Sequence, residues 1–84
     1  MPEKEAGVII KFFAKPSVAA IQVTGAIRVG DRLHYKGATT DFQEEVATME
    51  VDNKPVEGAK AGDMVGIKVQ ERVREGDKVF CVTD

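Results

Sequence analysis

Short runs of alternating apolar and polar residues, separated by glycine and proline, make up most of the chain. A Gly-Asp pair precedes three of these runs, at Gly30-Asp31, Gly62-Asp63 and Gly76-Asp77. Apolar residues stand two and four places after each Asp: Leu33 and Tyr35, Val65 and Ile67, Val79 and Cys81. Glycine supplies the positive φ of a tight turn, and Asp can bond the backbone just downstream. A period of two indicates strands with one buried face, so these three entries favour a sheet folded on itself.

Two further runs predict an antiparallel hairpin near the N-terminus. The first spans residues 7–14 and is rich in Val, Ile and Phe, and the second covers about residues 18–24. Lys15-Pro16-Ser17 separates them, because Pro16 cannot donate a hydrogen bond to a strand ladder. Residues 1–6 are polar and predict a flexible N-terminus, which leaves residues 7–84 as a single domain.

The segment from residue 40 to residue 51 carries two patterns at once. Phe42, Val46 and Met49 have helical spacing, and an Asp followed three places later by a Glu is typical of a capping box. A strand would instead require a change of phase between Val46 and Met49, which a β-bulge would supply. The residues alone leave both structures open. In either case six or so short strands remain, and a small closed barrel is the economical way to leave no sheet edge open.

Composition and charge limit the class of protein. The net charge is −2, but residues 1–40 carry six Lys and Arg against three Asp and Glu, whereas residues 41–84 carry six against eleven. Bulk charge therefore does not predict nucleic-acid binding, although a local basic surface is compatible with these numbers. The absence of a long apolar run and of a signal peptide predicts a cytoplasmic protein without a membrane segment. Cys81, the single cysteine, is expected to pack rather than react.

The order of small and apolar residues resembles the second domain of translational GTPases such as elongation factor Tu and initiation factor two. The residues that carry the resemblance include Gly7-Val8, Val23-Thr24-Gly25, Val29-Gly30-Asp31, Tyr35-Lys36-Gly37, Ala61-Gly62-Asp63, Val65-Gly66-Ile67 and Gly76-Asp77. The chain is also similar to the C-terminal barrel of the collagenase-like peptidase family, whose relatives modify RNA. The stretch from Phe42-Gln43 to Met49 is at least as typical of that group. Together these similarities cover roughly residues 7–82.

The resemblance implies an all-β fold, a closed six-stranded antiparallel Greek-key barrel of the translation-protein type, with residues 40–51 as strand. In those families the domain does not catalyse but docks on the small ribosomal subunit, on the end of an aminoacyl-tRNA or on a neighbouring protein domain. This chain lacks a Gly-x-x-x-x-Gly-Lys-Ser/Thr loop, so we expect no GTP binding. Thr48 and Met64 stand where elongation factor Tu has a Glu and an Asn in its pocket for the terminal adenosine. These departures weaken the case for tRNA-end binding and leave ribosome or protein docking open.

Basic side chains gather around the first Gly-Asp turn. Alternation places Arg32, His34 and Lys36 on one side of a strand, roughly 7 Å apart at each step. With Arg28 nearby, and with Lys11 and Lys15 as an extension, they are the candidate site for RNA phosphates or for a partner. The alternative is an ordinary solvated strand face, because Lys and Arg commonly occupy such positions.

No residue pattern indicates an enzyme, a metal site or a cofactor. His34 is the single histidine, no Cys/His cluster exists, and no nucleophile motif surrounds Ser17. An acidic run predicts a solvated rim that could meet a basic protein: Asp41, Glu44, Glu45, Glu50 and Asp52.

We therefore predict a free-standing, non-catalytic binding module associated with ribosomal RNA or a tRNA-containing complex. The alternative is a protein-interaction module that acts in trans as an accessory domain of a peptidase-like or RNA-modifying enzyme. A small-ligand barrel is a third reading, disfavoured because side chains must already fill so small a core.

Overall fold

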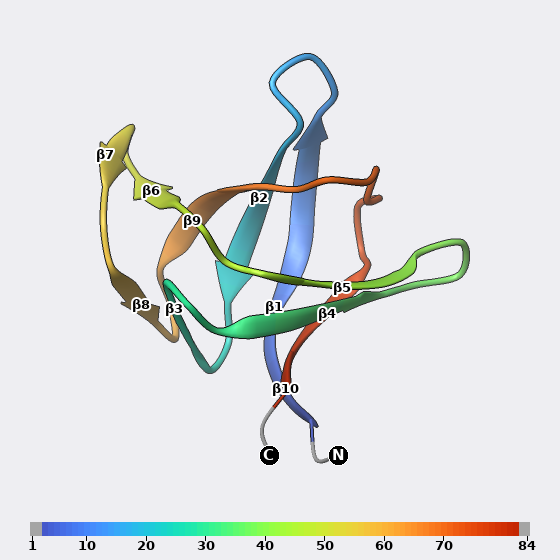
Figure 1. Cartoon of the computed structure of the whole chain (residues 1–84), viewed down its shortest axis with the longest axis horizontal. Coiled ribbons are helices and arrows are strands. Elements are labelled where there is room, and N and C mark those ends of the chain that lie inside the picture. The colour runs from blue at the N-terminus through green and yellow to red at the C-terminus, as the bar shows by residue number, and fades with distance from the viewer. Residues whose placement is uncertain (1–2, 83–84) are drawn as a thin grey trace.

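A computed structural model describes residues 3–82, and within that range the chain consists of strands and turns without a helix (Figure 1). The ten strands are β1 (Glu3–Phe13), β2 (Val18–Val23), β3 (Ala26–Arg28), β4 (Arg32–Lys36), β5 (Asp41–Glu45), β6 (Met49–Val51), β7 (Lys54–Pro55), β8 (Gly58–Lys60), β9 (Met64–Lys68) and β10 (Lys78–Val82). The ambiguous segment is therefore strand: β5 and β6 are separated by residues 46–48, where the alternation changes phase.

Eight strands form one antiparallel sheet in the order β5-β4-β10-β1-β2-β9-β6-β7, and β3 and β8 form a separate pair. The predicted β1–β2 hairpin is confirmed. β1 begins at Glu3, which pairs with Val82 of β10, so residues 3–6 belong to the sheet and not to a flexible N-terminus. Met1 and Pro2 lie outside the described residues.

The sheet has two end strands, β5 and β7, so the predicted closed six-stranded barrel is not found among residues 3–82. Backbone hydrogen bonds nevertheless connect the regions near both ends through the β3–β4 turn. Gly30 N–H donates to the carbonyl of Val46, just after β5, at 2.8 Å, and Val29 N–H donates to the carbonyl of Glu57, just after β7, at 2.9 Å.

Apolar side chains from both sheets meet in a single core. Its largest fully buried members are Tyr35, Ile9, Ile21, Ile27, Leu33, Met49, Ile67, Val23, Val46, Val65, Val73 and Val79. The inward positions predicted after the Gly-Asp pairs are confirmed, except that Cys81 is only partly buried and packs against the edge of this core. One core shared by the two sheets requires the strands to curl around it.

The three Gly-Asp turns share one backbone structure. The glycine φ angles are 96° at Gly30, 97° at Gly62 and 90° at Gly76. In each turn the Asp side chain accepts a hydrogen bond from the backbone N–H three residues earlier: Arg28 at 2.9 Å, Lys60 at 3.1 Å and Arg74 at 2.9 Å. The Asp therefore bonds the backbone upstream, not downstream as the sequence suggested, and fixes the start of the turn.

Each turn also grips one buried residue on a neighbouring segment. The glycine N–H donates to the carbonyl of the buried residue, and the N–H of the buried residue donates to the carbonyl of the Asp. The N···O distances are 2.8–2.9 Å in all three turns. The partners are Val46 for Gly30-Asp31, Val23 for Gly62-Asp63 and Ile9 for Gly76-Asp77. Two residues facing one, with glycine first, make a G1 β-bulge, which bends its strand and increases the local twist. Three such bulges explain how so short a chain curls its sheet.

Candidate binding surfaces

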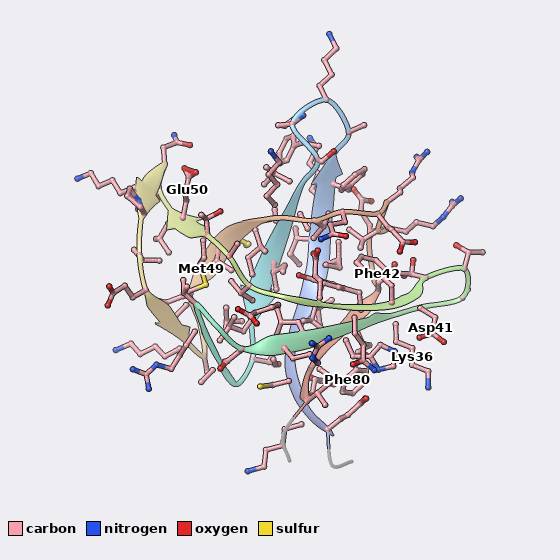
Figure 2. All side chains as sticks on the ribbon, viewed as in Figure 1. Lys36, Asp41, Phe42, Met49, Glu50 and Phe80 are labelled. Carbon is pink, nitrogen blue, oxygen red and sulfur yellow. The ribbon has the colours of Figure 1, made fainter. Side chains whose placement is uncertain are left out.

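The outer side of β4 carries the predicted basic strand. Arg32, His34 and Lys36 point away from the core, because Leu33 and Tyr35 between them are fully buried. Both neighbouring strands change the electrostatics of this face. In register, β5 sets Glu45, Gln43 and Asp41 beside the three basic residues, and β10 sets Val82, Phe80 and Lys78 on the other side. Figure 2 shows Lys36, Asp41 and Phe80 gathered at this part of the molecule.

His34 is held between two carboxylates. Its Nδ1 lies 2.9 Å from Glu3 Oε2, and its Nε2 lies 2.5 Å from Asp41 Oδ1. The hydrogen bond to Asp41 is the main reason that the pKa of His34 lies above its ordinary value, and the same bond lowers the pKa of Asp41. Both ring nitrogens have carboxylate partners, so His34 joins β1, β4 and β5.

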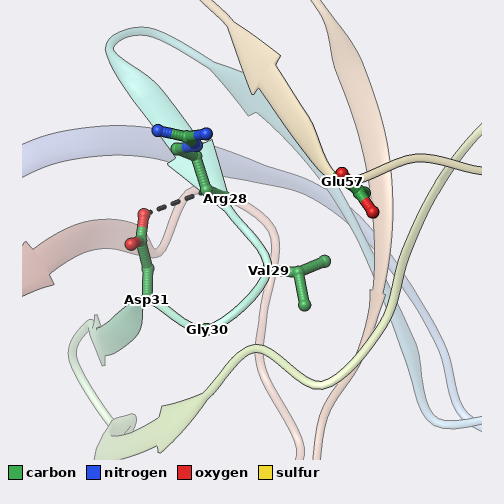
Figure 3. A pocket seen from close by; sticks show the side chains of 5 residues that line it. All are labelled: Arg28, Val29, Gly30, Asp31 and Glu57. Carbon is green, nitrogen blue, oxygen red and sulfur yellow. Dashed lines mark hydrogen bonds between the residues drawn. The ribbon is translucent and has the colours of Figure 1, made fainter.

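Arg28 ends β3, and its backbone N–H donates to Asp31 in the first Gly-Asp turn (Figure 3). Its surroundings form a shallow, open depression of about 470 Å³ lined by Arg28, Val29, Gly30, Asp31 and Glu57. Two acidic side chains thus share this depression with one guanidinium, so its lining is acidic overall and not basic.

Lys11 and Lys15 belong to the β1–β2 hairpin. The hairpin loop projects at the top of Figure 1, whereas β4 crosses the lower half of the molecule. Lys11 Nζ lies 5.3 Å from the centre of the Phe13 ring, within cation–π range. The six predicted binding residues thus come from β3, from β4 and from the β1–β2 hairpin, and their role in binding stays a prediction.

A groove crosses the outer face of β2, β9 and β6, and the sequence reasoning did not find it. Its volume is about 590 Å³, and it is lined by Phe13, Pro16, Val18, Ala20, Thr48, Glu50, Asp52, Asn53, Met64, Val65, Gly66 and Lys68. Phe13 and Met64 are 44% and 47% exposed, the two highest values among the exposed large hydrophobic residues. The sequence contained one indication of this groove: strand side chains alternate, so Met64, which immediately precedes the inward Val65, must face outward.

The acidic run does not form a single rim. Glu50 and Asp52 line the groove, whereas Glu44 of β5 turns toward the interior. Glu44 Oε2 accepts a hydrogen bond from Gln70 N–H at 3.3 Å, while Oε1 is buried without a partner among residues 3–82. Burial raises the pKa of Glu44. It also raises the pKa of Tyr35, whose hydroxyl is likewise buried and unpartnered within this range.

Within residues 3–82 no group of three or more His, Cys, Asp or Glu side chains is arranged to hold a metal ion. Burial is the main reason that the pKa of the Cys81 thiol is raised, which keeps it in the less reactive protonated form. The same part of the chain contains no helix long and apolar enough to span a bilayer.

No family model matches the chain. Among curated proteins, the uncharacterized protease MJ0090 of Methanocaldococcus jannaschii is 40% identical over 81 residues, which are 95% of this chain and 20% of that protein. A collagenase of Porphyromonas gingivalis is 32% identical over 73 residues, or 84% of this chain and 20% of the collagenase. The chain thus spans about a fifth of the length of these relatives.

A solved structure identifies the fold. The crystal structure of the C-terminal domain of a Geobacillus thermoleovorans protein assigned to the U32 peptidases superposes with a TM-score of 0.89 at 16% identity, over 95% of this chain and 93% of that domain. The chain shares the fold of a U32 peptidase C-terminal domain. The selenomethionine variant of the same domain gives a TM-score of 0.86. These similarities support the collagenase-like side of the resemblance and do not show the translation-factor side.

Proposed function

We propose that this chain is a non-catalytic accessory β-domain that binds the catalytic region of a peptidase-like enzyme. The observation that carries the proposal is the extent of the similarity. Nearly the whole chain matches one fifth of a protease, and the matching fold belongs to a C-terminal domain that was solved apart from the rest of its peptidase. A domain that such enzymes carry beside their other regions is expected to contact one of them.

The chemistry of the side chains supports a binding role over a catalytic one. The single histidine is occupied by two carboxylates, and the single thiol has a raised pKa. A general base needs access to a substrate proton, and a cysteine nucleophile needs a lowered pKa, so neither residue has the required environment.

Surface chemistry favours a protein over RNA as the partner. The groove combines apolar side chains with Glu50 and Asp52, and carboxylates repel a phosphate backbone. The basic strand lies beside Asp41 and Glu45, which reduce its positive potential. An accessory role in trans, with the catalytic region on another chain, is the form of this proposal that an experiment can address directly.

The test mixes this chain with the Methanocaldococcus jannaschii protease from which the matching 81 residues have been removed. We expect the two proteins to co-elute in size-exclusion chromatography after nuclease treatment. The full-length protease is the matched control, because its own segment should already occupy the contact surface. Separate elution of the chain from the truncated protease would contradict the proposal.

We also propose that the sheet closes into the six-stranded barrel in solution. The hydrogen bonds from the β3–β4 turn to Val46 and Glu57 support closure, since they connect the segments that follow the two end strands. Slow amide exchange at Val29 and Gly30, matching that of core strands, is the expected sign, and rapid exchange at both would argue for an open sheet.

A further inference from the structure

We propose that the groove on the outer face of β2, β9 and β6 binds a polypeptide segment with a bulky apolar residue next to Lys or Arg. This inference deepens the proposed function, on which it rests for the idea that the partner is a protein. It adds the surface of this chain that makes the contact and the chemistry of the segment that is bound.

The floor of the groove consists of small residues from adjacent strands. Ala20 of β2 lies opposite Gly66 of β9, and Gly66 lies opposite Glu50 of β6. A Cβ atom at Gly66 would lie 3.3 Å from Val18 Cγ1, so the neighbouring side chain already occupies the adjacent space. Because the small residues are flanked by larger ones, the outer face is hollow at this point, and a hollow surface fits a protruding side chain better than it fits a second copy of itself.

Two apolar side chains border this floor along the strand direction. Phe13 lies at the end of β1 beside Val18, and Met64 lies at the start of β9 beside Gln22. They are separated by more than half the chain in sequence, yet both line one groove and both are exposed to solvent. Exposed hydrophobic residues that gather in one place mark a binding surface more often than scattered ones do. A Phe, Leu or Met side chain of the partner would lie on the floor between them.

The carboxylates that line the groove predict that the residue next to the partner's apolar side chain is basic. Glu50 borders the floor on β6, and Asp52 follows in the β6–β7 turn. Figure 2 shows Glu50 and Met49 on opposite sides of their strand, as expected when Met49 is buried and Glu50 faces outward. Lys68 lies at the opposite end of the groove, next to Val18. A cation on the partner beside its apolar residue would therefore meet two carboxylates.

The turns at the rim hold a defined shape. Among residues 3–82 the non-glycine residues with positive φ are Ser17 at 56°, Asp52 at 53° and Asn53 at 64°. Asp52 and Asn53 line the groove, and Ser17 adjoins Pro16, which also lines it. Asp and Asn adopt this left-handed conformation in tight turns, which gives the rim at Asp52 and Asn53 a defined backbone shape.

The experiment titrates the whole chain with three nonapeptides that differ only in the central three residues: Lys-Phe-Lys, Glu-Phe-Glu and Lys-Ser-Lys. Amide NMR shifts report both the site and the affinity. We expect the Lys-Phe-Lys peptide to bind at about millimolar affinity or better, with shifts at residues 18–20, 50–53 and 64–66, and the other two to bind at least about tenfold more weakly.

Three substitutions distinguish binding in the groove from non-specific binding. Met64→Glu should weaken the Lys-Phe-Lys peptide about tenfold or more. Val29→Glu, at a residue 40% exposed in the depression of Figure 3, should change nothing. Glu50→Lys should reverse the preference toward the Glu-Phe-Glu peptide, an outcome that a loss of folding cannot mimic.

The groove assignment would be overturned by no binding of any peptide, by equal binding of the acidic peptide, or by shifts that map to β4. Binding of a single-stranded RNA by residues of the groove would overturn it as well. If the chain binds the truncated protease but Met64→Glu has no effect, the groove assignment fails and the accessory function stands. If the peptide binds and the truncated protease does not, the accessory function fails alone.

Discussion

At the scale of single residues, His34 shows how neighbours decide the role of a side chain. The sequence placed it correctly on the outer side of its strand, with Arg32 and Lys36. It gave no signal that Glu3, 31 positions away, would reach one ring nitrogen, because that contact depends on β10 lying between β4 and β1. A residue that looked like a phosphate ligand is therefore part of an ion-pair bridge that joins three strands.

This bridge predicts a pH dependence of stability. The pKa of His34 in the folded state lies above the ordinary 6.5. Protonated His34 therefore contributes its full stabilisation below about pH 6.5, and this stabilisation is lost as the pH rises through the raised pKa. The contribution of Asp41, whose pKa is lowered, is lost as the pH falls through that lowered value. Urea unfolding of the wild type and of His34→Gln, from about pH 5 to about pH 8.5, should give a stability difference that shrinks with rising pH. A difference that grows over this range would refute the assignment.

Arg32 provides the residue-scale test of the RNA hypothesis. If β4 binds phosphates, affinity for ribosomal RNA should fall steeply with added salt, and Arg32→Glu should weaken it more than Lys60→Glu does. Because Glu45 lies beside Arg32 in the sheet, we expect no measurable RNA affinity at physiological salt in a filter-binding assay. Tight, salt-sensitive binding that Arg32→Glu abolishes would restore the phosphate-binding role of β4.

At the scale of elements, the Gly-Asp turns were the most informative part of the sequence. Their spacing predicted the inward residues of β4, β9 and most of β10, because a period of two is fixed by strand geometry alone. Their spacing could not reveal which segment each turn grips. The partners Val46, Val23 and Ile9 are set by the order of strands in the sheet, and that order is a property of the whole chain.

The turns predict a specific cost for losing glycine. Gly62 has a φ of 97°, where an L side chain is strained, so Gly62→Ala should lower the free energy of unfolding by about 1–3 kcal/mol. Gly58→Ala is the control, because a Cβ there would lie 3.5 Å from Arg28 Cγ, an ordinary contact, and should change stability by less than about 1 kcal/mol. Thermal unfolding followed by circular dichroism measures both. Equal effects at the two positions would show that conformation does not limit the turn.

The core strand β9 offers a second test at this scale. Val65 and Ile67 are each fully buried, so replacing either with Ala should cost about 2–4 kcal/mol in unfolding free energy. Lys68→Ala, on the exposed side of the same strand, should stay within about 0.5 kcal/mol of the wild type in the same denaturant titration. A loss well under 1 kcal/mol at both core positions would contradict the inward assignment of β9.

At the scale of the whole molecule, local pattern predicted much of the fold and little of the binding surface. The all-β class, the N-terminal hairpin and the core residues follow from alternation and turn residues. The groove combines Phe13 and Ala20 of the N-terminal hairpin with Glu50 and Met64, which are distant in the sequence and join them because β6 pairs with β9 and β9 with β2. No local pattern contains that pairing, whereas Arg32, His34 and Lys36 stand close together in one strand and are visible from the sequence.

Docking of this chain through its groove is tested most directly by a hydrogen-exchange footprint in the presence of the truncated Methanocaldococcus jannaschii protease. An accessory domain that docks through its groove predicts slowed exchange at residues 16–20, 48–53 and 64–68, with residues 28–36 unchanged. Met64→Glu should remove that protection and Val29→Glu should keep it. Protection confined to residues 28–36, or no protection anywhere, would contradict the account.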